Sequence, residues 1–322
     1  MFIVGITGVY FGAEGLVRGS SNLSRDLGIK PIIIGLTVVA FGTSSPELAV
    51  SLTASIKESD EIAIGNIIGS NIANIGLVLG VAAIVLPLKV ESVIMKKELP
   101  LMIAFAVGLY LMAIDTEIGF VDGLFLFTGI ILYISYQIYN AVNSKVKSHN
   151  SMGNTPDNKV GITKLADKQI TTRRKNLFLN ILYIVLGLTG LLIGAHLLVK
   201  AAIFIAGRLG ISEMVIGLTV VAFGTSVPEM ATSVVSALRK EVDICVGNVI
   251  GSNIFNILMV IGSVALIRPL NVAREALFFE LPAMLLFSAA LIPMIRGNLK
   301  IKRIEGFLLV LGYFIFIFLL FR

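Results

Sequence analysis

The chain has 322 residues, of which 56% are hydrophobic and only 14% are charged. A soluble globular domain carries about 25% charged residues, so this composition excludes that class and predicts a membrane protein. The formal net charge of +6 comes from Lys and Arg in the loops, where they report membrane topology and do not indicate a nucleic-acid surface. The single cysteine, Cys245, rules out an internal disulfide.

Ten apolar stretches are long enough to cross the hydrocarbon core as helices. In chain order they lie near residues 1–18, 31–56, 62–86, 99–114, 120–142, 177–199, 212–238, 244–267, 276–295 and 304–321. The first stretch leads directly into further spans, so we expect no cleavable signal peptide. Residues 143–176 are polar and rich in Asn, Ser and Lys, which predicts a flexible connector. The expected fold is therefore an all-α membrane protein with ten transmembrane helices.

The two halves of the chain repeat each other at one constant offset in residue number, here called the repeat offset, which takes residue 35 to residue 217. Residues 35–47 (GLTVVAFGTSSPE) and 217–229 (GLTVVAFGTSVPE) are identical at twelve of thirteen positions. The same offset relates 65–71 to 247–253 and 98–100 to 280–282. Each half holds five spans, and an odd number inserts the second half upside down relative to the first, as in the inverted repeats of secondary transporters. The domains are thus a first repeat (1–142, motif 35–74), a connector (143–176) and a second repeat (177–322, motif 217–256).

The distribution of Lys and Arg predicts the orientation of the chain in the cell membrane. Alternate loops carry 20 of the 26 basic residues, and the opposite side with both termini carries 6. These basic loops are 18–30, 87–98, 143–176, 239–243 and 296–303. The positive-inside rule places them in the cytoplasm. Both termini are then expected outside.

Each copy of the thirteen-residue motif carries one acid, Glu47 or Glu229, in the middle of a span. An acid at that depth is a functional-site candidate by default. In a helix, four residues recur at i, i+3, i+4 and i+7 and share one face: Ala40, Thr43, Ser44 and Glu47, or Ala222, Thr225, Ser226 and Glu229. Pro46 and Pro228 each remove a backbone hydrogen bond. We therefore expect carbonyls near residues 40–43 to be free to face a ligand, as in broken helices that line a cavity.

The next span of each half carries a polar stripe with a spacing of four. The stripes are Asn66, Ser70 and Asn74 in the first half, and Asn248, Ser252 and Asn256 in the second. Together with the two Glu residues they supply only oxygen ligands, which suit Ca²⁺ better than a soft metal. Asn66 and Asn248 could equally be interhelical links. Asn71 and Asn253 are expected to face the bundle in a structural role.

At these motifs the sequence resembles the Ca²⁺/cation antiporter superfamily, and within it the prokaryotic Na⁺/Ca²⁺ exchangers. The resemblance covers all ten spans and is carried by GTSSPE with GNIIGSNIAN and by GTSVPE with GNVIGSNIFN. It implies an antiporter that exchanges Na⁺ for Ca²⁺ by alternating access, without ATP or a cofactor. The ligands that it implies are Glu47, Thr43, Ser44, Ala40, Ser70, Asn74, Glu229, Thr225, Ser226, Ala222, Ser252 and Asn256. Some relatives carry Asp at the position of Asn256, which weighs against K⁺ coupling here.

Other functions fit the sequence less well. A cation/proton antiporter on the same scaffold is the alternative, although the extra motif Glu of that branch is missing. An intramembrane hydrolase using Ser44 or Ser226 would need a base, and no His-based partner is evident. No nucleotide-binding Gly-rich loop is present, so ATP is not the expected energy source. Glu98 and Glu280 read as N-terminal helix caps, and His196 as a packed or interfacial residue.

Overall fold

The computed structural model describes residues 1–150, 162–208 and 222–320. The helices of the first half are α1 (Phe2–Leu27), α2 (Pro31–Ile34), α3 (Ala40–Thr43), α4 (Ser45–Ile56), α5 (Asp60–Ala73), α6 (Gly80–Val85), α7 (Leu99–Met112) and α8 (Phe120–Asn150). Three π-helical turns continue these helices: Gly35–Val39 before α3, Asn74–Leu79 before α6 and Ile94–Glu98 before α7. A 3₁₀ turn, Ala113–Asp115, follows α7.

The described helices of the second half are α9 (Ile162–Arg208), α11 (Ala222–Thr225), α12 (Val227–Leu238), α13 (Val242–Phe255), α14 (Gly262–Ile267), α15 (Leu281–Arg296) and α16 (Arg303–Leu320). The π-helical turns Asn256–Ile261 and Ala276–Glu280 precede α14 and α15. The repeat offset relates both turns to turns of the first half. The repeat seen in the sequence is therefore also a repeat of local backbone structure.

The predicted spans are found in part. Within the described ranges, seven helices are long and apolar enough to cross a membrane, and α2–α3 with α4 would be an eighth, bent by 41°. The predicted span 1–18 lies in α1, which runs on to Leu27 and is not among these seven helices. The predicted span 212–238 begins outside the described residues and continues as α12. The structure confirms a multi-span helical architecture, and the count of ten stays a prediction.

The polar segment 143–176 was predicted to be a flexible connector, but its described residues are helical. α8 continues to Asn150 and α9 already begins at Ile162, while 151–161 lie outside the described residues. The stretch from Ile162 to Leu186 holds no Gly or Pro. Leu, Lys and Arg, which recur there, are good helix formers. The polar composition of this segment therefore did not predict its helical structure.

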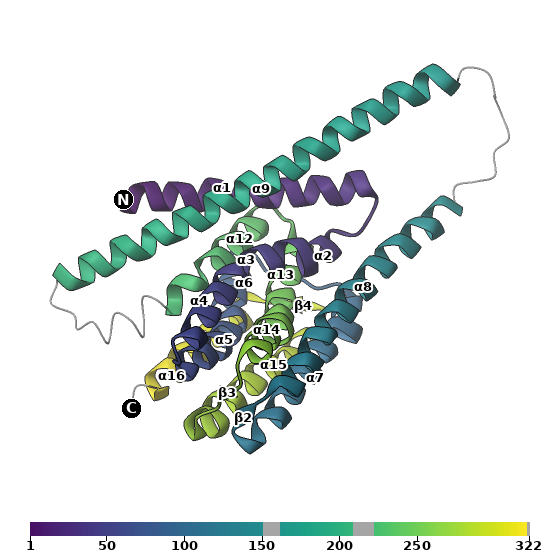
Figure 1. Cartoon of the computed structure of the whole chain (residues 1–322). Coiled ribbons are helices and arrows are strands. Elements are labelled where there is room, and N and C mark those ends of the chain that lie inside the picture. The colour runs from purple at the N-terminus through teal and green to yellow at the C-terminus, as the bar shows by residue number, and fades with distance from the viewer. Residues whose placement is uncertain (151–161, 209–221, 321–322) are drawn as a thin grey trace.

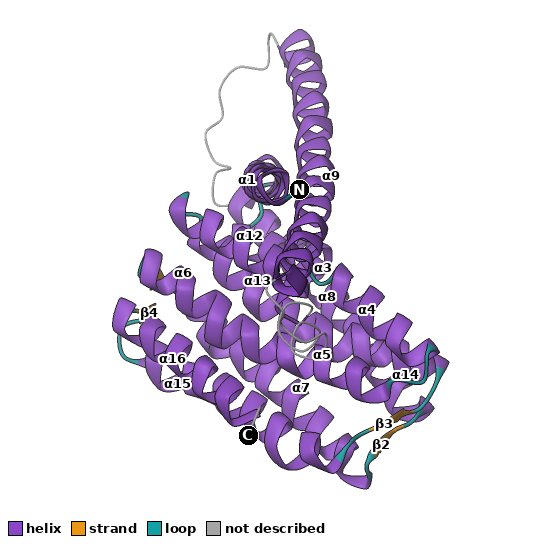
Figure 2. Cartoon of the chain, turned by 90° about the vertical axis from the view of Figure 1, so that its left-hand side faces the viewer, coloured by secondary structure: helices purple, strands orange, loops and turns teal. Residues whose placement is uncertain are grey.

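Two short antiparallel strand pairs connect the halves at opposite ends of the bundle (Figure 2). β1 (Leu88–Lys89) pairs with β4 (Lys300–Ile301), with Leu88 opposite Ile301. β2 (Glu117–Ile118) pairs with β3 (Leu270–Asn271), with Ile118 opposite Leu270. Each pair takes one strand from each half, so the two halves interlock and do not form separate domains.

α5 with α6, and α13 with α14, form the centre of the bundle. Of the most apolar part of each span, 83% and 78% respectively is buried, against 17% for α16. α13 approaches the π-helical turn Gly35–Val39 closely at Gly251. A Cβ atom at this position would clash with the backbone of Leu36. The two polar stripes lie on these central spans, so the fold places them in its interior.

α1 and α9 form a closely packed pair on one side of the remaining helices (Figures 1 and 2). Their contact is made by glycines, including Gly12 and Gly194. A Cβ atom at Gly187 would clash with the backbone of Leu16 and with the carbonyl of Gly12. Small residues allow membrane helices to approach in this way.

We expect Gly187→Leu to destabilise the folded protein, because overpacking of a tight contact costs about 1–3 kcal/mol. Thermal unfolding of the purified protein in detergent measures this effect. Gly108→Leu on α7 is the matched control, since a Cβ there meets no described atom within 4 Å. If both variants unfolded at the wild-type temperature, the close contact between α1 and α9 would be incorrect.

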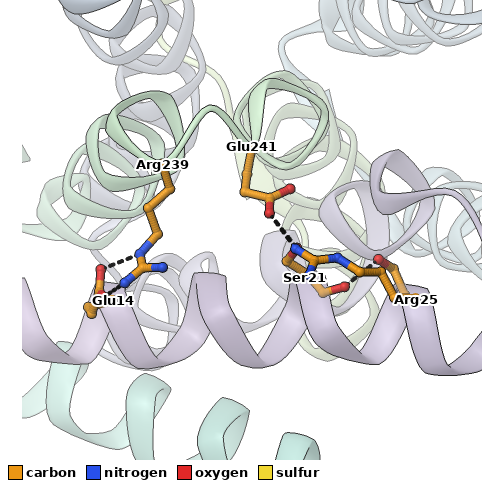
Figure 3. Close-up of polar contacts among 6 residues, drawn as sticks. Glu14, Ser21, Arg25, Arg239 and Glu241 are labelled. Atoms are coloured by element: carbon orange, nitrogen blue, oxygen red, sulfur yellow. Dashed lines mark hydrogen bonds and ion pairs between the residues drawn. The ribbon is translucent and has the colours of Figure 1, made fainter.

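Ion pairs tie α1 to the turn between α12 and α13 (Figure 3). Arg239 pairs with Glu14. Arg25 pairs with Glu241 at 2.9 Å, and the Ser21 hydroxyl donates to the same carboxylate at 2.5 Å. The repeat offset relates Glu14 to a histidine, His196, and Arg239 to a lysine, Lys57. A histidine and a lysine cannot form the equivalent ion pair, so the two faces of the molecule differ.

Candidate cation-binding site

The two motif helices break at equivalent serines. α3 ends at Thr43 and α4 begins at Ser45, with Ser44 between them at φ −83° and ψ 3°. Ser226 separates α11 from α12 with nearly the same angles, φ −86° and ψ 1°. Pro46 and Pro228 lie in the first turn after each break, where the missing N–H costs little. The predicted helix break is thus confirmed in both halves.

The expected free carbonyl is not observed at Ala40. Its oxygen accepts the backbone N–H of Ser44 at 3.0 Å and the hydroxyl of Thr43 at 3.4 Å. The chain therefore keeps regular helical bonding up to the break itself. Ala40 is fully buried, and Ala222 belongs to α11, although its side chain lies outside the described residues.

Glu47 and Glu229 are fully buried and lie in the first turns of α4 and α12. The positive end of each helix dipole favours a carboxylate there. The two carboxylates are close enough to interact electrostatically. Ser70 donates to Glu47 Oε1 at 3.3 Å, and Ser44 donates to Glu229 Oε1 at 3.4 Å. The second oxygen of each carboxylate, Oε2, is buried without a hydrogen-bond partner among the described residues.

Threonine and asparagine side chains connect the two halves beside the carboxylates. Thr43 Oγ1 donates to Asn248 Oδ1 at 3.1 Å, and Thr225 Oγ1 lies 3.4 Å from Asn66 Oδ1. The Thr43 hydroxyl also lies 3.4 Å from that of Ser252. The amide nitrogens of Asn66 and Asn248 donate to serines on α4 and α12 at 2.9 Å and 3.3 Å. Because both ends of each amide are engaged, Asn66 and Asn248 are interhelical links in this structure.

Asn74 and Asn256 begin two π-helical turns, a backbone feature that is frequent at functional sites. Both are fully buried. Their amide nitrogens donate to Asn253 Oδ1 and Asn71 Oδ1, each at 3.1 Å. Their own carbonyl oxygens have no hydrogen-bond partner within the described part of the chain. Asn71 and Asn253 thus do more than pack in the bundle, because they bind the amides of two candidate ligands.

Buried oxygens without a partner gather on the elements that carry the predicted ligands. Among the described residues ten buried side-chain oxygens lack a partner, and five of them belong to predicted ligands: Glu47 Oε2, Glu229 Oε2, Asn74 Oδ1, Asn256 Oδ1 and Ser226 Oγ. The other five belong to Ser20, Ser55, Asp60, Thr232 and Ser236. A buried polar atom without a hydrogen bond is costly and requires an explanation, such as a bound ion. Carboxylate, amide and hydroxyl oxygens are ligands that hard cations prefer. The donor set therefore fits a transported cation as substrate.

Comparison with known proteins agrees with this chemistry. Residues 1–143 and 179–322 match the family described as sodium/calcium exchanger protein. The chain belongs to this family. The exchanger is similar to the sodium/calcium exchanger MaX1 of Methanosarcina acetivorans, with 36% identity over 99% of this chain and 98% of that protein. It is also similar to the putative antiporter CaxA of Alkalimonas amylolytica, with 36% identity over 99% of this chain and 97% of that protein.

A solved structure resembles the whole exchanger. It is the sodium-calcium exchanger NCX_Mj soaked with 10 mM Na⁺ and zero Ca²⁺, with 32% identity and a TM-score of 0.82. The match covers 98% of this chain and 96% of that one. The protein is therefore a multi-pass membrane transporter and not an enzyme, which also removes the hydrolase alternative.

The predicted caps at Glu98 and Glu280 are wrong for this exchanger. Glu98 ends the π-helical turn Ile94–Glu98, and the helix continues without interruption into α7. Glu280 has the same place between Ala276–Glu280 and α15. Pro100 and Pro282 lack a backbone N–H, but a π-helical turn precedes each of them and continues directly into the helix, which therefore begins a turn earlier than the sequence suggested.

Several residues behind the exchanger's site were not found by sequence reasoning. Ser51 and Ser233 hold the amides of Asn66 and Asn248, and the repeat offset relates one serine to the other. Comparing every polar residue with its counterpart at the repeat offset, and not only the motif residues, would have identified this pair. His196 is exposed on α9, so the packed position is wrong, and the interfacial position stays a prediction.

Proposed function

We propose that this exchanger moves Na⁺ and Ca²⁺ in opposite directions by alternating access around one central site. The set of buried oxygens without partners carries this proposal, because both halves contribute to it on broken or π-distorted helices. Inverted repeats that meet at a midplane site are typical of secondary transporters. In this proposal the chain has ten spans, five in each half.

The proposed ligands fall into two groups. Glu47, Glu229, Asn74, Asn256 and Ser226 supply oxygens that lack a hydrogen-bond partner among the described residues. The other candidates are Thr43, Ser44, Ser70, Thr225, Ser252, Ala40 and Ala222. Their hydroxyl oxygens retain lone pairs while they donate a hydrogen bond, so they can complete the coordination of a cation. The Ala40 carbonyl already accepts two hydrogen bonds, and it would have to exchange the longer one, from Thr43, for the cation.

Uptake of ⁴⁵Ca²⁺ into proteoliposomes tests the proposed function. An outward Na⁺ gradient should drive Ca²⁺ uptake, and dissipating that gradient with a Na⁺ ionophore should stop it. Imposed H⁺ and K⁺ gradients are the comparison arms. Uptake driven by H⁺ and indifferent to Na⁺ would replace the proposal by the cation/proton antiporter, which uses the same two buried carboxylates.

We expect both termini outside the cell and residues 143–176 in the cytoplasm, because 20 of the 26 Lys and Arg lie in the loops of that side. An epitope tag at residue 1 should bind antibody on intact cells. A tag placed within 151–161 should bind only after the membrane is permeabilised. The opposite pattern would reverse the orientation of the site.

A further inference from the structure

Four asparagines form two hydrogen bonds between the halves, next to the candidate ligands. Asn74 Nδ2 donates to Asn253 Oδ1 and Asn256 Nδ2 donates to Asn71 Oδ1, each at 3.1 Å. All four side chains are at most 1% exposed. Each bond joins one half of the chain to the other, and the repeat offset relates one bond to its counterpart.

Two methionines bind the far side of this network. Asn71 Nδ2 donates to Met284 Sδ at 3.5 Å, and Asn253 Nδ2 donates to Met102 Sδ at 3.7 Å and to the backbone carbonyl of Asn71 at 3.4 Å. Both methionines are 1% exposed, and the repeat offset relates them as well. A thioether sulfur can accept a hydrogen bond but has no proton to donate. The sulfur therefore favours the orientation in which Asn71 or Asn253 turns its NH₂ group toward it.

The orientation of the outer amides then determines that of the inner ones. With the NH₂ group of Asn71 on Met284, its carbonyl oxygen faces Asn256 and can only accept. Asn256 must present its NH₂ group to that oxygen, which leaves its own Oδ1 buried without a described partner. If the Asn256 amide were reversed, two carbonyl oxygens would oppose each other, and an NH₂ group would take the place of the free oxygen. An NH₂ group repels a cation and offers it no lone pair.

We propose that Asn71 and Asn253, anchored by Met284 and Met102, are positioning residues that keep the Asn256 and Asn74 carbonyl oxygens directed at the transported cation. The inference rests on the proposed function, because these oxygens matter to binding only if the site holds a cation. Residues that orient ligands in this way typically change metal affinity by about 10–100-fold when they are replaced.

Equilibrium binding of ⁴⁵Ca²⁺ and ²²Na⁺ to the purified full-length protein provides the first test. Asn71→Leu and Asn253→Leu should each weaken binding by about 10–100-fold. Met284→Leu and Met102→Leu preserve volume but remove the acceptor, so binding should weaken by about two- to tenfold while the protein stays folded. Met259→Leu is the matched control, since Met259 is buried near Asn256 on the same π-helical turn and should leave binding unchanged.

Infrared difference spectra with isotope-labelled asparagine separate positioning from packing. In the wild type, added Ca²⁺ should shift both an asparagine carbonyl band and the carboxylate bands. In Met284→Leu combined with Met102→Leu, the asparagine shift should shrink while the carboxylate shift remains. Unchanged binding and an unchanged asparagine shift in these variants would overturn the positioning role alone. A wild type that bound neither cation would overturn the proposed function, and the inference with it.

Discussion

Glu47→Gln and Glu229→Gln should each reduce Ca²⁺ transport by more than about 100-fold. Replacing a residue that only orients a ligand typically costs about 10–100-fold, and these two residues are proposed to bind the cation directly. Ca²⁺ requires anionic oxygen to compensate for its lost hydration. Both carboxylates are fully buried, and each has one oxygen without a described hydrogen-bond partner. Glutamine keeps the shape of the side chain and removes its charge. Na⁺-driven ⁴⁵Ca²⁺ flux in proteoliposomes measures the loss, and size-exclusion chromatography confirms that each variant is folded.

Glu98→Gln is the matched control for this prediction. Glu98 is also a buried acid, 3% exposed, in an apolar span. Its carboxylate accepts from the Tyr133 hydroxyl at 3.2 Å and from the Gln137 amide at 2.9 Å, away from the candidate ligands. Its replacement should leave exchange within about twofold of the wild type, since it makes no proposed contact with the cation. Near wild-type exchange in either site variant would contradict the paired-carboxylate site.

Exchange should be electrogenic and independent of K⁺, because of the charge of the site. Asn74 and Asn256 are neutral, so two ionised Glu residues give a charge of −2, which one Ca²⁺ or two Na⁺ neutralise. A third Na⁺ can be coordinated by the amide oxygens, but these do not cancel its charge of +1. A cycle that exchanges three Na⁺ for one Ca²⁺ moves one net charge, and the membrane potential then contributes about 2.3 kcal/mol per 100 mV. A potential of about 100 mV should therefore shift the Ca²⁺ gradient at equilibrium by about 50-fold, since about 1.4 kcal/mol corresponds to tenfold.

Ca²⁺ flux under a potential set with valinomycin measures this voltage dependence, and Rb⁺ tracer reports any cotransport of K⁺. Asn256→Asp is the informative variant, since it adds a third acid that can balance the third Na⁺. Its flux should fall more steeply with acidification, because three carboxylates must then be free of protons. A wild-type flux that ignored voltage, or that strictly required K⁺, would contradict this charge count.

The sequence by itself determined the class of the protein and the composition of its site. A hydrophobic content of 56% requires a membrane environment, and the repeat offset pairs Glu47 with Glu229. Proline one residue before each Glu predicted the helix break, because it removes a backbone hydrogen bond whatever the surroundings are. These features are local or periodic, and local chemistry is sufficient to recognise them.

Only the tertiary structure decided which side chains meet. Helical spacing places Asn71 on a face but does not say that Asn256 and Met284, from the other half, bind its amide there. The structure also showed that α9 extends into the polar connector. It showed that Glu98 lies within a continuous helix, at the end of a π-helical turn, and does not cap a helix start. Contacts between residues of different halves arise from how the two halves pack, and no periodicity within one half encodes them.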